Sequence, residues 1–140
     1  MAEYDRDNVF AKILRGEFPC HKVHEDDDTL VIMDIMPRGD GHALVIPKAP
    51  SRNILDIEAG DLAALYATVQ RIARAAIGAF GAEGVTIQQF NEPAGGQVVF
   101  HLHVHVIPRK AQISLRPPAS FKETPEMLTA HAEMIRAALK

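Results

Sequence analysis

The sequence predicts an α+β fold, in which a five-stranded antiparallel sheet is combined with one short helix, one long helix and a further C-terminal helix. Three observations support this prediction. Five short runs of β-forming residues are bounded by turn residues, and a long amphipathic stretch lies between the third and the fourth run. Neither a regular β–α–β alternation nor a GxGxxG motif indicates a parallel sheet. We expect the helices to lie on one side of the sheet.

The strands are predicted from runs in which apolar and β-branched residues cluster or alternate with period two. The acidic run from Glu25 to Asp28 separates the first two strands as a hairpin turn. A loop containing Pro37, Gly39 and Gly41 follows the second strand. The five predicted strands are Lys22–His24, Thr29–Ile35, His42–Pro47, Val85–Phe90 and Val99–Ile107.

The helices are predicted from apolar residues that recur at helical spacing. A short helix covers about residues 9–14, with Asp7 and Asn8 as possible caps. The long helix covers roughly residues 59–80, and Gly81 stands where a C-terminal cap glycine is expected. The last helix begins near Thr124–Pro125, which combines an N-cap residue with a proline in the first turn.

The bulk composition is that of one ordinary globular domain. The chain has 140 residues, of which 47% are hydrophobic and 24% charged, and its formal net charge is −3. This charge argues against general nucleic-acid binding, although a small anionic ligand could still be held by local donors. The polar, acidic N-terminus contains no signal sequence, no apolar run is long enough to span a membrane, and Cys20 is the only cysteine. We therefore expect a cytoplasmic protein with no nucleic-acid or membrane partner.

Three of the seven histidines lie in the last predicted strand. Alternation along a strand places His101, His103 and His105 on one face, with neighbouring imidazoles about 6–7 Å apart. The opposite face carries Leu102, Val104 and Val106. Folding alone does not require this pattern, because Thr, Lys or Glu would serve a solvated strand face equally well.

Three interpretations of these histidines remain open on the residues alone. They can be structural histidines with satisfied hydrogen bonds. They can be metal ligands, since imidazoles bind zinc, copper and iron, but no Asp or Glu is interleaved and a third ligand four residues along the strand reaches poorly. They can also perform nucleophilic and acid–base chemistry on a phosphoryl group, because a neutral imidazole can attack phosphorus and form a covalent intermediate.

The segment just before the histidines favours the phosphoryl interpretation. Gly95-Gly96-Gln97-Val98 offers backbone N–H groups in a permissive turn and a side-chain amide. Such donors suit the oxygen atoms of a phosphate. A Gly-Gly turn by itself is more often only a hairpin, but here it directly precedes three histidines.

These residues resemble a known family. The segment from Asn91 to Phe100 leads into His101-Leu102-His103-Val104-His105-Val106-Ile107, which resembles the histidine triad (HIT) signature His-φ-His-φ-His-φ-φ, with φ apolar. The resemblance extends over residues 9–109 and includes Ile32–Ile35 and His42–Lys48. It implies a single HIT domain over residues 1–140, with a core at 9–109 and a C-terminal extension at 111–140.

The resemblance implies a nucleotide hydrolase or nucleotidyl transferase that acts at the α-phosphate. By this resemblance His103 is the nucleophile, and His101 and His105 orient it and assist the leaving group. His42 matches a further family histidine near the triad, although it can also be an ordinary histidine at a strand edge.

The resemblance also implies the nucleotide-binding residues. Asn91, Gly96, Gln97 and the backbone of Val98 are expected at the phosphate. Asp34 is expected to hold the ribose hydroxyls, its alternative being a turn residue at a strand end. The expected base pocket, each of whose members is also a credible core residue, consists of Val9, Phe10, Ile32 and Ile35.

Two departures from the family pattern are visible. Some relatives hold a structural zinc with two cysteines near the first helix, where this chain has Asn8 and Ala11. We therefore expect no metal and no cofactor. The segment after Lys110 is longer than in the smallest phosphoramidase-like members, so the resemblance does not decide the substrate preference. By resemblance we expect a homodimer in which two five-stranded sheets join.

The sequence thus suggests a hydrolase of purine nucleoside phosphoramidates that forms a nucleotidyl-histidine intermediate. A dinucleoside polyphosphate hydrolase would use the same His103 chemistry. A nucleotide-binding regulatory protein with incidental hydrolysis and a metal-dependent hydrolase are the alternatives from other classes.

Overall fold

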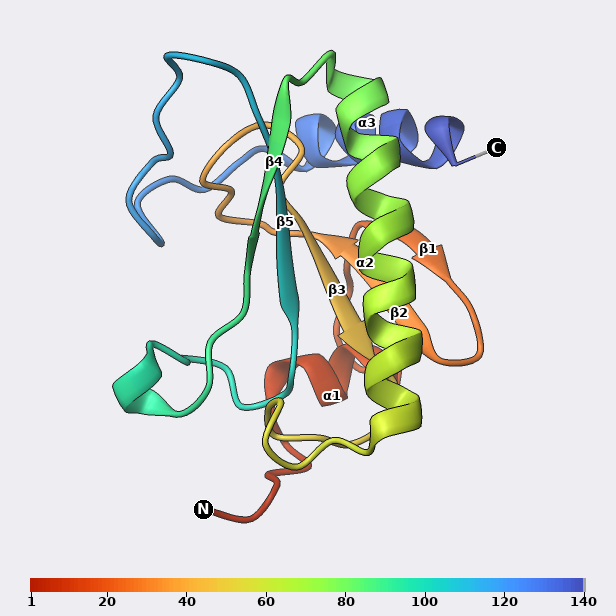
Figure 1. Cartoon of the computed structure of the whole chain (residues 1–140), viewed down its shortest axis with the longest axis vertical. Helices are drawn as coiled ribbons and strands as arrows, with labels where there is room; N and C mark the ends of the chain where they lie inside the picture. Colours follow the sequence, from red (N-terminus) through yellow and green to blue (C-terminus); the bar gives the residue numbers. More distant parts are fainter. Residues whose placement is uncertain (140) are drawn as a thin grey trace.

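The computed structural model describes residues 1–139, and Lys140, the last residue of the predicted extension, lies outside the described residues. Five strands form one sheet in the order β1-β2-β3-β5-β4, and every neighbouring pair is antiparallel (Figure 1). The predicted α+β class is therefore confirmed. The strands are β1 (Lys22–Glu25), β2 (Thr29–Met33), β3 (Ala43–Pro47), β4 (Gly84–Gln88) and β5 (Val104–Arg109).

The three helices begin and end close to the predicted positions. The Asn8 side chain accepts the N–H of Ala11 at the start of α1, and the Thr124 side chain accepts that of Met127 at the start of α3. Gly81 ends α2 in the left-handed conformation, with φ of 58°. Within residues 1–139 no helix is both long and apolar enough to cross a membrane. The helices are α1 (Val9–Leu14), α2 (Ala59–Phe80) and α3 (Pro125–Ala138), and a 3-10 turn, η1, covers Pro93–Gly95.

The sheet is covered on both faces, so the expectation of helices on one side is wrong. Every residue of β2 and β3 is buried, and one layer of helices cannot cover side chains that alternate between two faces. Val31, Val45 and Val104 belong to the core cluster that includes residues of α2 and α3. On the opposite face α1 inserts Phe10 into a second cluster, formed with Leu30, Ile32, Leu44 and Ile46.

The last strand is shorter than predicted, because β5 begins only at Val104. Val104 pairs with Val45, so Leu102 would stand opposite Pro47 if the ladder continued. Pro47 has no N–H to donate, and its carbonyl oxygen instead lies 2.8 Å from Nε2 of His101. His101 and His103 therefore lie in an irregular segment that precedes the strand, and of the three histidines only His105 is part of β5.

The predicted C-terminal extension folds back onto the loop that follows β2. The N–H of Arg116 donates to the carbonyl of Arg38 at 2.8 Å, and Nε of Arg38 donates to the carbonyl of Arg116 at 2.8 Å. The N–H of Glu123 donates to the carbonyl of Ile35. Figure 1 shows this tail segment beside the loop between β2 and β3, before the chain continues into α3. The extension thus braces the loop that leads to His42.

Replacing Gly41 with alanine tests how tightly this loop is packed. Gly41 has φ of +82°, and a Cβ atom there would lie 2.6 Å from Cε2 of Phe80 at the end of α2. Gly16 is the matched control, because its φ is +80° but no atom lies within 4 Å of its Cβ position. We expect Gly16→Ala to lower the free energy of unfolding by about 1 kcal/mol through backbone strain. Gly41→Ala should cost about 1–3 kcal/mol more through overpacking.

Urea unfolding of both variants measures the difference. Equal losses for Gly41→Ala and Gly16→Ala would contradict the close packing of the loop against Phe80.

Candidate active site

His103 lies between α1 and β5 with a defined tautomer. Its Nδ1 lies 2.7 Å from the carbonyl oxygen of His101, and because a carbonyl oxygen can only accept, Nδ1 carries the proton. Nε2 then holds a free lone pair in the neutral ring. Burial lowers the pKa of His103, and the edge of the Phe10 ring packs against it with 4.8 Å between the ring centroids. A neutral imidazole whose lone pair is on Nε2 has the form required of a nucleophile.

His101 is fully buried, and both of its ring nitrogens are engaged by the protein. Nε2 donates to the carbonyl of Pro47, so Nδ1 is the acceptor for the hydroxyl of Tyr4 at 2.6 Å. Burial lowers the pKa of His101 to about 4, which keeps the ring neutral. Neither nitrogen is left to contact a ligand, and His101 instead touches His103 through its own carbonyl.

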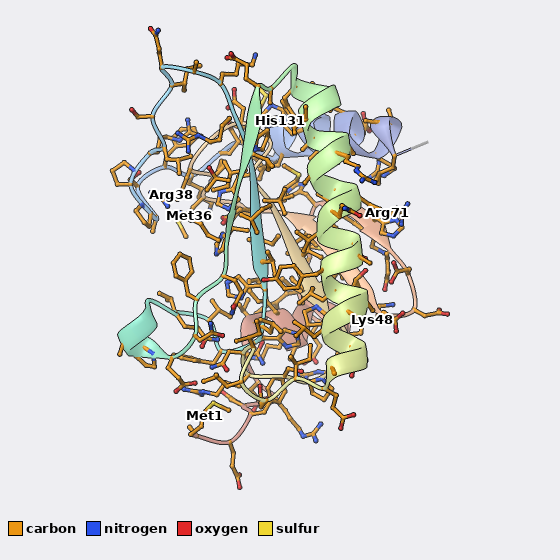
Figure 2. The ribbon with its side chains drawn as sticks, in the orientation of Figure 1. Met1, Met36, Arg38, Lys48, Arg71 and His131 are labelled. Atoms are coloured by element: carbon orange, nitrogen blue, oxygen red, sulfur yellow. The ribbon has the colours of Figure 1, made fainter. Side chains whose placement is uncertain are left out.

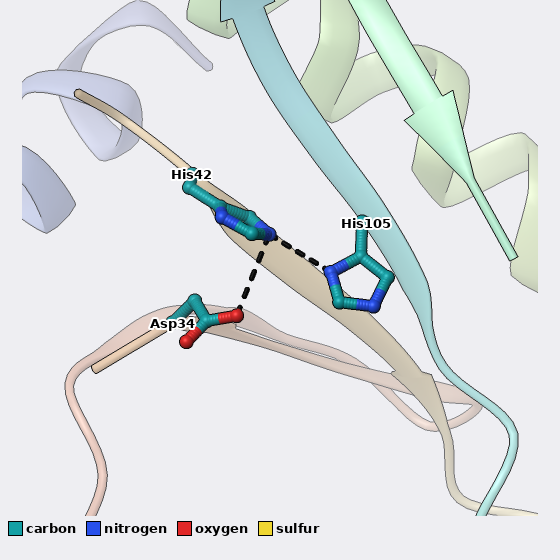
Figure 3. Close-up of side chains that lie close together, drawn as sticks. All are labelled: Asp34, His42 and His105. Atoms are coloured by element: carbon teal, nitrogen blue, oxygen red, sulfur yellow. Dashed lines mark hydrogen bonds and ion pairs between the residues drawn. The ribbon is translucent and has the colours of Figure 1, made fainter. Parts of the chain in front are cut away.

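His105 joins His42 and Asp34 in a polar cluster (Figure 3). The backbone N–H of Arg38 donates to Nδ1 of His42, so the proton of His42 resides on Nε2. This Nε2–H lies 2.9 Å from Nδ1 of His105 and 3.4 Å from Oδ2 of Asp34. His105 therefore accepts at Nδ1 and carries its own proton on Nε2. Burial is the main cause that lowers the pKa of His42 to about 3 and that of His105 to about 4.

This cluster is a poor fit for a metal ion, although its three ligand atoms lie within 4.8 Å of one another. A cation needs a lone pair on Nε2 of His42, and the bond from Arg38 places a proton there. The positive charges of Arg38 and Arg116 also lower the pKa of His42, and they would repel a cation in the same way.

The residues at the zinc position of some relatives do not fit a metal either. Oδ1 of Asn8 accepts the N–H of Ala11 at 2.8 Å, and Nδ2 donates to the carbonyl of Asp5. His101, which lies behind α1, has both nitrogens engaged. The polar atoms of Asn8 and His101 are thus used in hydrogen bonds within the protein, whereas a zinc site would require side chains with free lone pairs.

Asp34 lies directly after β2 and is half-buried. Its Oδ1 accepts the N–H of Met36 at 2.9 Å, and Oδ2 faces His42. Burial raises the pKa of Asp34. A carboxylate has about four acceptor positions, so both oxygens can still accept from two hydroxyl groups.

The four residues expected around a base divide into two pairs. Phe10 and Ile32 are buried in the core on the α1 side, with exposures of 8% and 3%. Val9 and Ile35 are exposed by 38% and 49%. Only the second pair therefore offers apolar surface to a ligand, whereas Phe10 supports the ring of His103.

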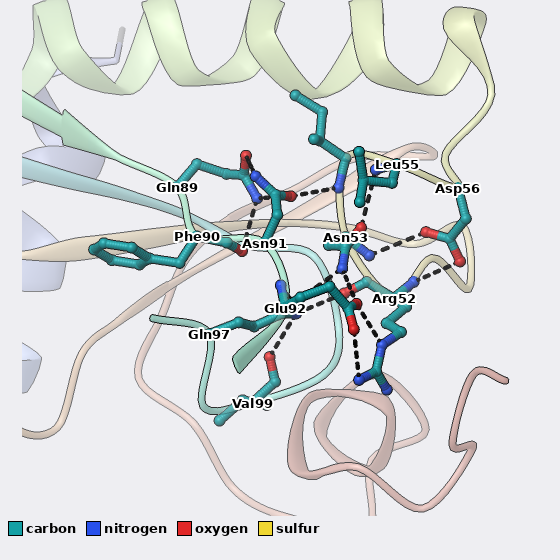
Figure 4. A network of polar contacts seen from close by, with 11 residues as sticks. Arg52, Asn53, Leu55, Asp56, Gln89, Phe90, Asn91, Glu92, Gln97 and Val99 are labelled. Atoms are coloured by element: carbon teal, nitrogen blue, oxygen red, sulfur yellow. Dashed lines mark hydrogen bonds and ion pairs between the residues drawn. The ribbon is translucent and has the colours of Figure 1, made fainter. Parts of the chain in front are cut away.

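Gln97 shapes the glycine loop and offers no free side-chain donor (Figure 4). Its Nε2 donates to the carbonyls of Arg52 and Val99, at 2.7 and 3.0 Å. Its Oε1 accepts from Nδ2 of Asn53 and from the N–H of Glu92. All donors and acceptors of the Gln97 side-chain amide are thereby used. The backbone N–H of Gln97 also donates to the carbonyl of Glu92.

Other predicted phosphate contacts keep free donors. Oδ1 of Asn91 accepts the N–H of Ile54, and Nδ2 donates one of its two hydrogens to Gln89, which leaves the other available. Val98 is 83% exposed, and within residues 1–139 its N–H donates to no protein group. Gly96 permits the turn, with φ of +95° and only 3.3 Å between its Cβ position and the Phe90 ring.

Arg52, Asn53 and Glu92 are functional candidates that the sequence did not reveal. Arg52 pairs with the Glu92 carboxylate at 2.7 and 3.2 Å and lies over the Phe100 ring, 4.2 Å from its centroid. Asn53 donates to the same carboxylate at 2.6 Å. Glu92 has φ of 64°, which is unusual for a residue other than glycine. Arg52 and Asn53 thus stabilise the strained turn at Glu92. Because they lie about forty residues before it in the chain, no local sequence pattern indicates this contact.

A histidine segment beside a glycine turn, on a five-stranded antiparallel sheet, defines the class of histidine triad proteins. A family model described as "HIT domain" matches residues 15–112. The chain is 42% identical over 104 residues to an Arabidopsis thaliana protein named adenylylsulfatase HINT3. The aligned residues are 74% of this chain and 53% of that protein. This chain therefore matches only about half the length of that relative.

Two other proteins match over nearly their whole length. The Schizosaccharomyces pombe protein named adenosine 5'-monophosphoramidase hnt1 is 31% identical over 135 residues, which cover 94% of this chain and 98% of that protein. A Bartonella henselae crystal structure, described as a Hit-like protein involved in cell-cycle regulation with unknown ligand, is 48% identical. It covers 98% of this chain and 99% of its own, with a TM-score of 0.94. The chain belongs to the HIT family.

Removing the hydroxyl of Tyr4 tests how firmly His101 is held. Tyr4→Phe leaves Nδ1 of the buried His101 without a donor, so we expect the free energy of unfolding to fall by about 1–3 kcal/mol. Tyr66→Phe is the matched control, because Tyr66 is 36% exposed on α2. Chemical unfolding of the two variants measures the effect, and equal losses would contradict the predicted role of Tyr4.

The lowered pKa values predict a pH-dependent stability. His42, His101 and His105 have folded pKa values of about 3, 4 and 4, below the ordinary value of 6.5. As the pH falls below 6.5 the unfolded chain binds protons first. Their contribution to stability is therefore fully present above pH 6.5 and is lost down to about pH 4 for His101 and His105 and about pH 3 for His42. The raised pKa of Asp34 acts in the opposite direction and offsets part of this loss.

We expect the free energy of unfolding to fall by about 2 kcal/mol or more between pH 7 and pH 5. Urea unfolding at several pH values measures the slope. A stability that is constant over this range would contradict the neutral, buried state of these histidines.

Proposed function

We propose that this protein is a nucleotide hydrolase that acts at the α-phosphate of purine nucleoside phosphoramidates, with His103 as the nucleophile. The observation that carries the proposal is the bond from Nδ1–H of His103 to the carbonyl of His101, which leaves the Nε2 lone pair free. Two relatives support the hydrolase class, since one is named an adenylylsulfatase and another an adenosine 5'-monophosphoramidase.

In the first step Nε2 of His103 forms a bond to phosphorus while the bond from phosphorus to the leaving amine breaks. The leaving nitrogen takes up a proton from solvent and departs as a neutral amine. The imidazole then carries a nucleotidyl group on Nε2 and a proton on Nδ1, so the ring is positively charged. The carbonyl oxygen of His101 accepts that Nδ1–H and stabilises the developing charge.

In the second step water forms a bond to phosphorus, the Nε2–phosphorus bond breaks, and the water releases one proton to solvent. His103 is released as the neutral ring and the product is a nucleoside monophosphate. Splitting the displacement in this way replaces one difficult step with two easier ones.

The phosphate oxygens are held by the donors that the protein leaves free. These are Nε2–H of His105, the N–H of Val98 and the remaining amide hydrogen of Asn91. We assign Gln97 and Gly96 a different role, because they shape the turn that presents these donors. His42 fixes the tautomer of His105, which keeps the His105 proton on the nitrogen nearer the substrate.

The nucleoside is held by groups on the same face. Asp34 accepts the ribose hydroxyls, and the exposed side chains of Val9 and Ile35 line the base. His101 acts as a positioning residue, since Tyr4 and Pro47 hold its ring and its carbonyl holds His103. No step requires a metal or another cofactor.

We also propose that two copies join through β4. This strand lies at one edge of the sheet, next to β5, and its residue Ile87 is 40% exposed. An uncovered strand edge has unpaired backbone groups that a second copy can satisfy. The resulting homodimer would have about twice the mass of the chain in light scattering.

The central test uses His103→Ala with adenosine phosphoramidate and with diadenosine polyphosphate. We expect the variant to lose turnover of both substrates by a factor of about 10³ or more, because the nucleophile is absent. His21→Ala is the matched control, since His21 contacts Thr129 of α3 and lies outside the proposed site. A chelator should leave the wild-type rate unchanged.

The outcomes separate the alternatives. Turnover by His103→Ala at the wild-type rate would overturn the nucleophile assignment, and loss of activity with chelator would indicate a metal-dependent hydrolase. A higher rate with the diadenosine compound would favour the dinucleoside polyphosphate hydrolase. Nucleotide binding without turnover of either substrate would favour a regulatory protein.

A further inference from the structure

A second candidate site lies at the far end of β5, away from His103. It is a cavity of about 180 Å³ between the loop after β2, the end of α2 and the segment that follows β5. Its lining contains one acidic residue, Asp40, and apolar groups such as Phe80 and Leu115. Four cationic side chains line it: Arg38, Arg109, Lys110 and Arg116.

The three arginines are held in place by neutral acceptors. Nη1 of Arg38 donates to the amide oxygen of Gln88 at 3.2 Å, and its Nε donates to a backbone carbonyl. Nη1 of Arg109 donates to the hydroxyl of Thr86 at 2.9 Å, and its Nη2 to a backbone carbonyl. Nε of Arg116 donates to the carbonyl of Pro37 at 3.0 Å, and its guanidinium lies 4.5 Å from the centroid of the Phe121 ring. These contacts fix the guanidinium groups in space but do not neutralise them.

The charges of this cluster are uncompensated. Within residues 1–139 none of the four cationic groups forms an ion pair, whereas Lys22, Lys48 and Arg52 all pair with carboxylates. Nη2 of Arg116 is also buried, and it has no hydrogen-bond partner in the described part of the chain. An unsatisfied buried donor on a charged group is costly, so a fixed cluster of this kind is stabilised when an anion occupies it.

We propose that this cavity binds a tetrahedral oxyanion with two negative charges, that is, a phosphate or sulfate group. Guanidinium groups present planar pairs of N–H donors that match two oxygens of such an anion, and the ammonium group of Lys110 adds a point charge. The proposal does not depend on the catalytic role of His103, because none of its lining residues belongs to the proposed nucleotide site.

The anion site is nevertheless connected to the triad, because Arg38 contacts residues of both regions. The backbone N–H of Arg38 holds Nδ1 of His42, and its side chain holds Gln88, which stands opposite His105 in the β4–β5 ladder. The bound group can therefore be free inorganic phosphate, or a distal phosphate of a nucleotide whose α-phosphate lies at His103. Both sources present the same kind of phosphate group to the arginines, and the experiment below distinguishes them.

The experiment is a titration followed by two-dimensional amide NMR, with inorganic phosphate as the first probe. We expect saturable shifts at residues 38–40, 80–82 and 108–116. The double variant Arg109→Gln/Lys110→Gln should bind phosphate at least about tenfold more weakly. Arg71→Gln/Arg74→Gln is the control with the same charge change, because both arginines are exposed on α2. Figure 2 shows Arg71 on the side of the molecule opposite Arg38.

A second arm identifies the source of the anion with the inactive His103→Ala protein. If the site takes a terminal phosphate of the nucleotide, removing the two charges weakens binding of adenosine triphosphate about tenfold but leaves the affinity for adenosine monophosphate unchanged. If it takes free phosphate, the double variant loses affinity for inorganic phosphate only. Either result supports the anion site.

The proposal is overturned if the cavity variant and the control variant bind every probe equally, or if phosphate shifts only residues 91–98 beside the triad. Thermal unfolding shows whether the double variant is folded. If it is not, Lys110→Gln alone provides the test, since Lys110 is exposed, and about threefold weaker binding is expected. Unchanged binding by that variant would then overturn the proposal.

Discussion

The hydrogen bond from Nδ1 of His103 to the carbonyl of His101 is the interaction on which the candidate site depends. It determines which nitrogen of His103 carries the proton, and in the proposed mechanism it stabilises the ring when Nε2 becomes substituted. The bond is only as precise as the position of His101, whose ring is held by Tyr4 and Pro47 in the interior. In the proposed mechanism, His101 therefore positions His103 without contacting the substrate itself.

Much of the fold follows from local patterns, and the differences have identifiable causes. Caps and periodicity placed α2 and the starts of α1 and α3, because these signals act within a few residues. The helices were wrongly expected on one side, although the uninterrupted apolar runs of β2 and β3 already indicate burial on both faces. The start of β5 depends on Pro47, which stands opposite it in the sheet and could not be related to it without knowing the register.

The candidate site was predictable in its residues but not in its hydrogen bonds. Alternation identified His103 and His105 as neighbours, and their ring centroids lie 5.1 Å apart. The partners that set the tautomers follow no local pattern. For His101 the partner is the carbonyl of Pro47, 54 positions away, and for His42 it is the backbone N–H of Arg38 in the preceding loop. Gln97 shows the same limit, because two of the four bonds of its side-chain amide go to Asn53 and Arg52, about forty-five positions away, and spacing alone cannot reveal them.

Through the reciprocal bonds between Arg38 and Arg116, the C-terminal extension stabilises the segment that carries Asp34 and His42. The tail therefore acts on the segment that carries His42, which contacts β5 through the hydrogen bond between His42 and His105. Substitutions in the tail can shift the electrostatic potential at His42, or the reach of its neighbouring loop, while the bond between His101 and His103 stays intact. In the proposed mechanism, a change in this tail would alter substrate selectivity without altering the attack by His103.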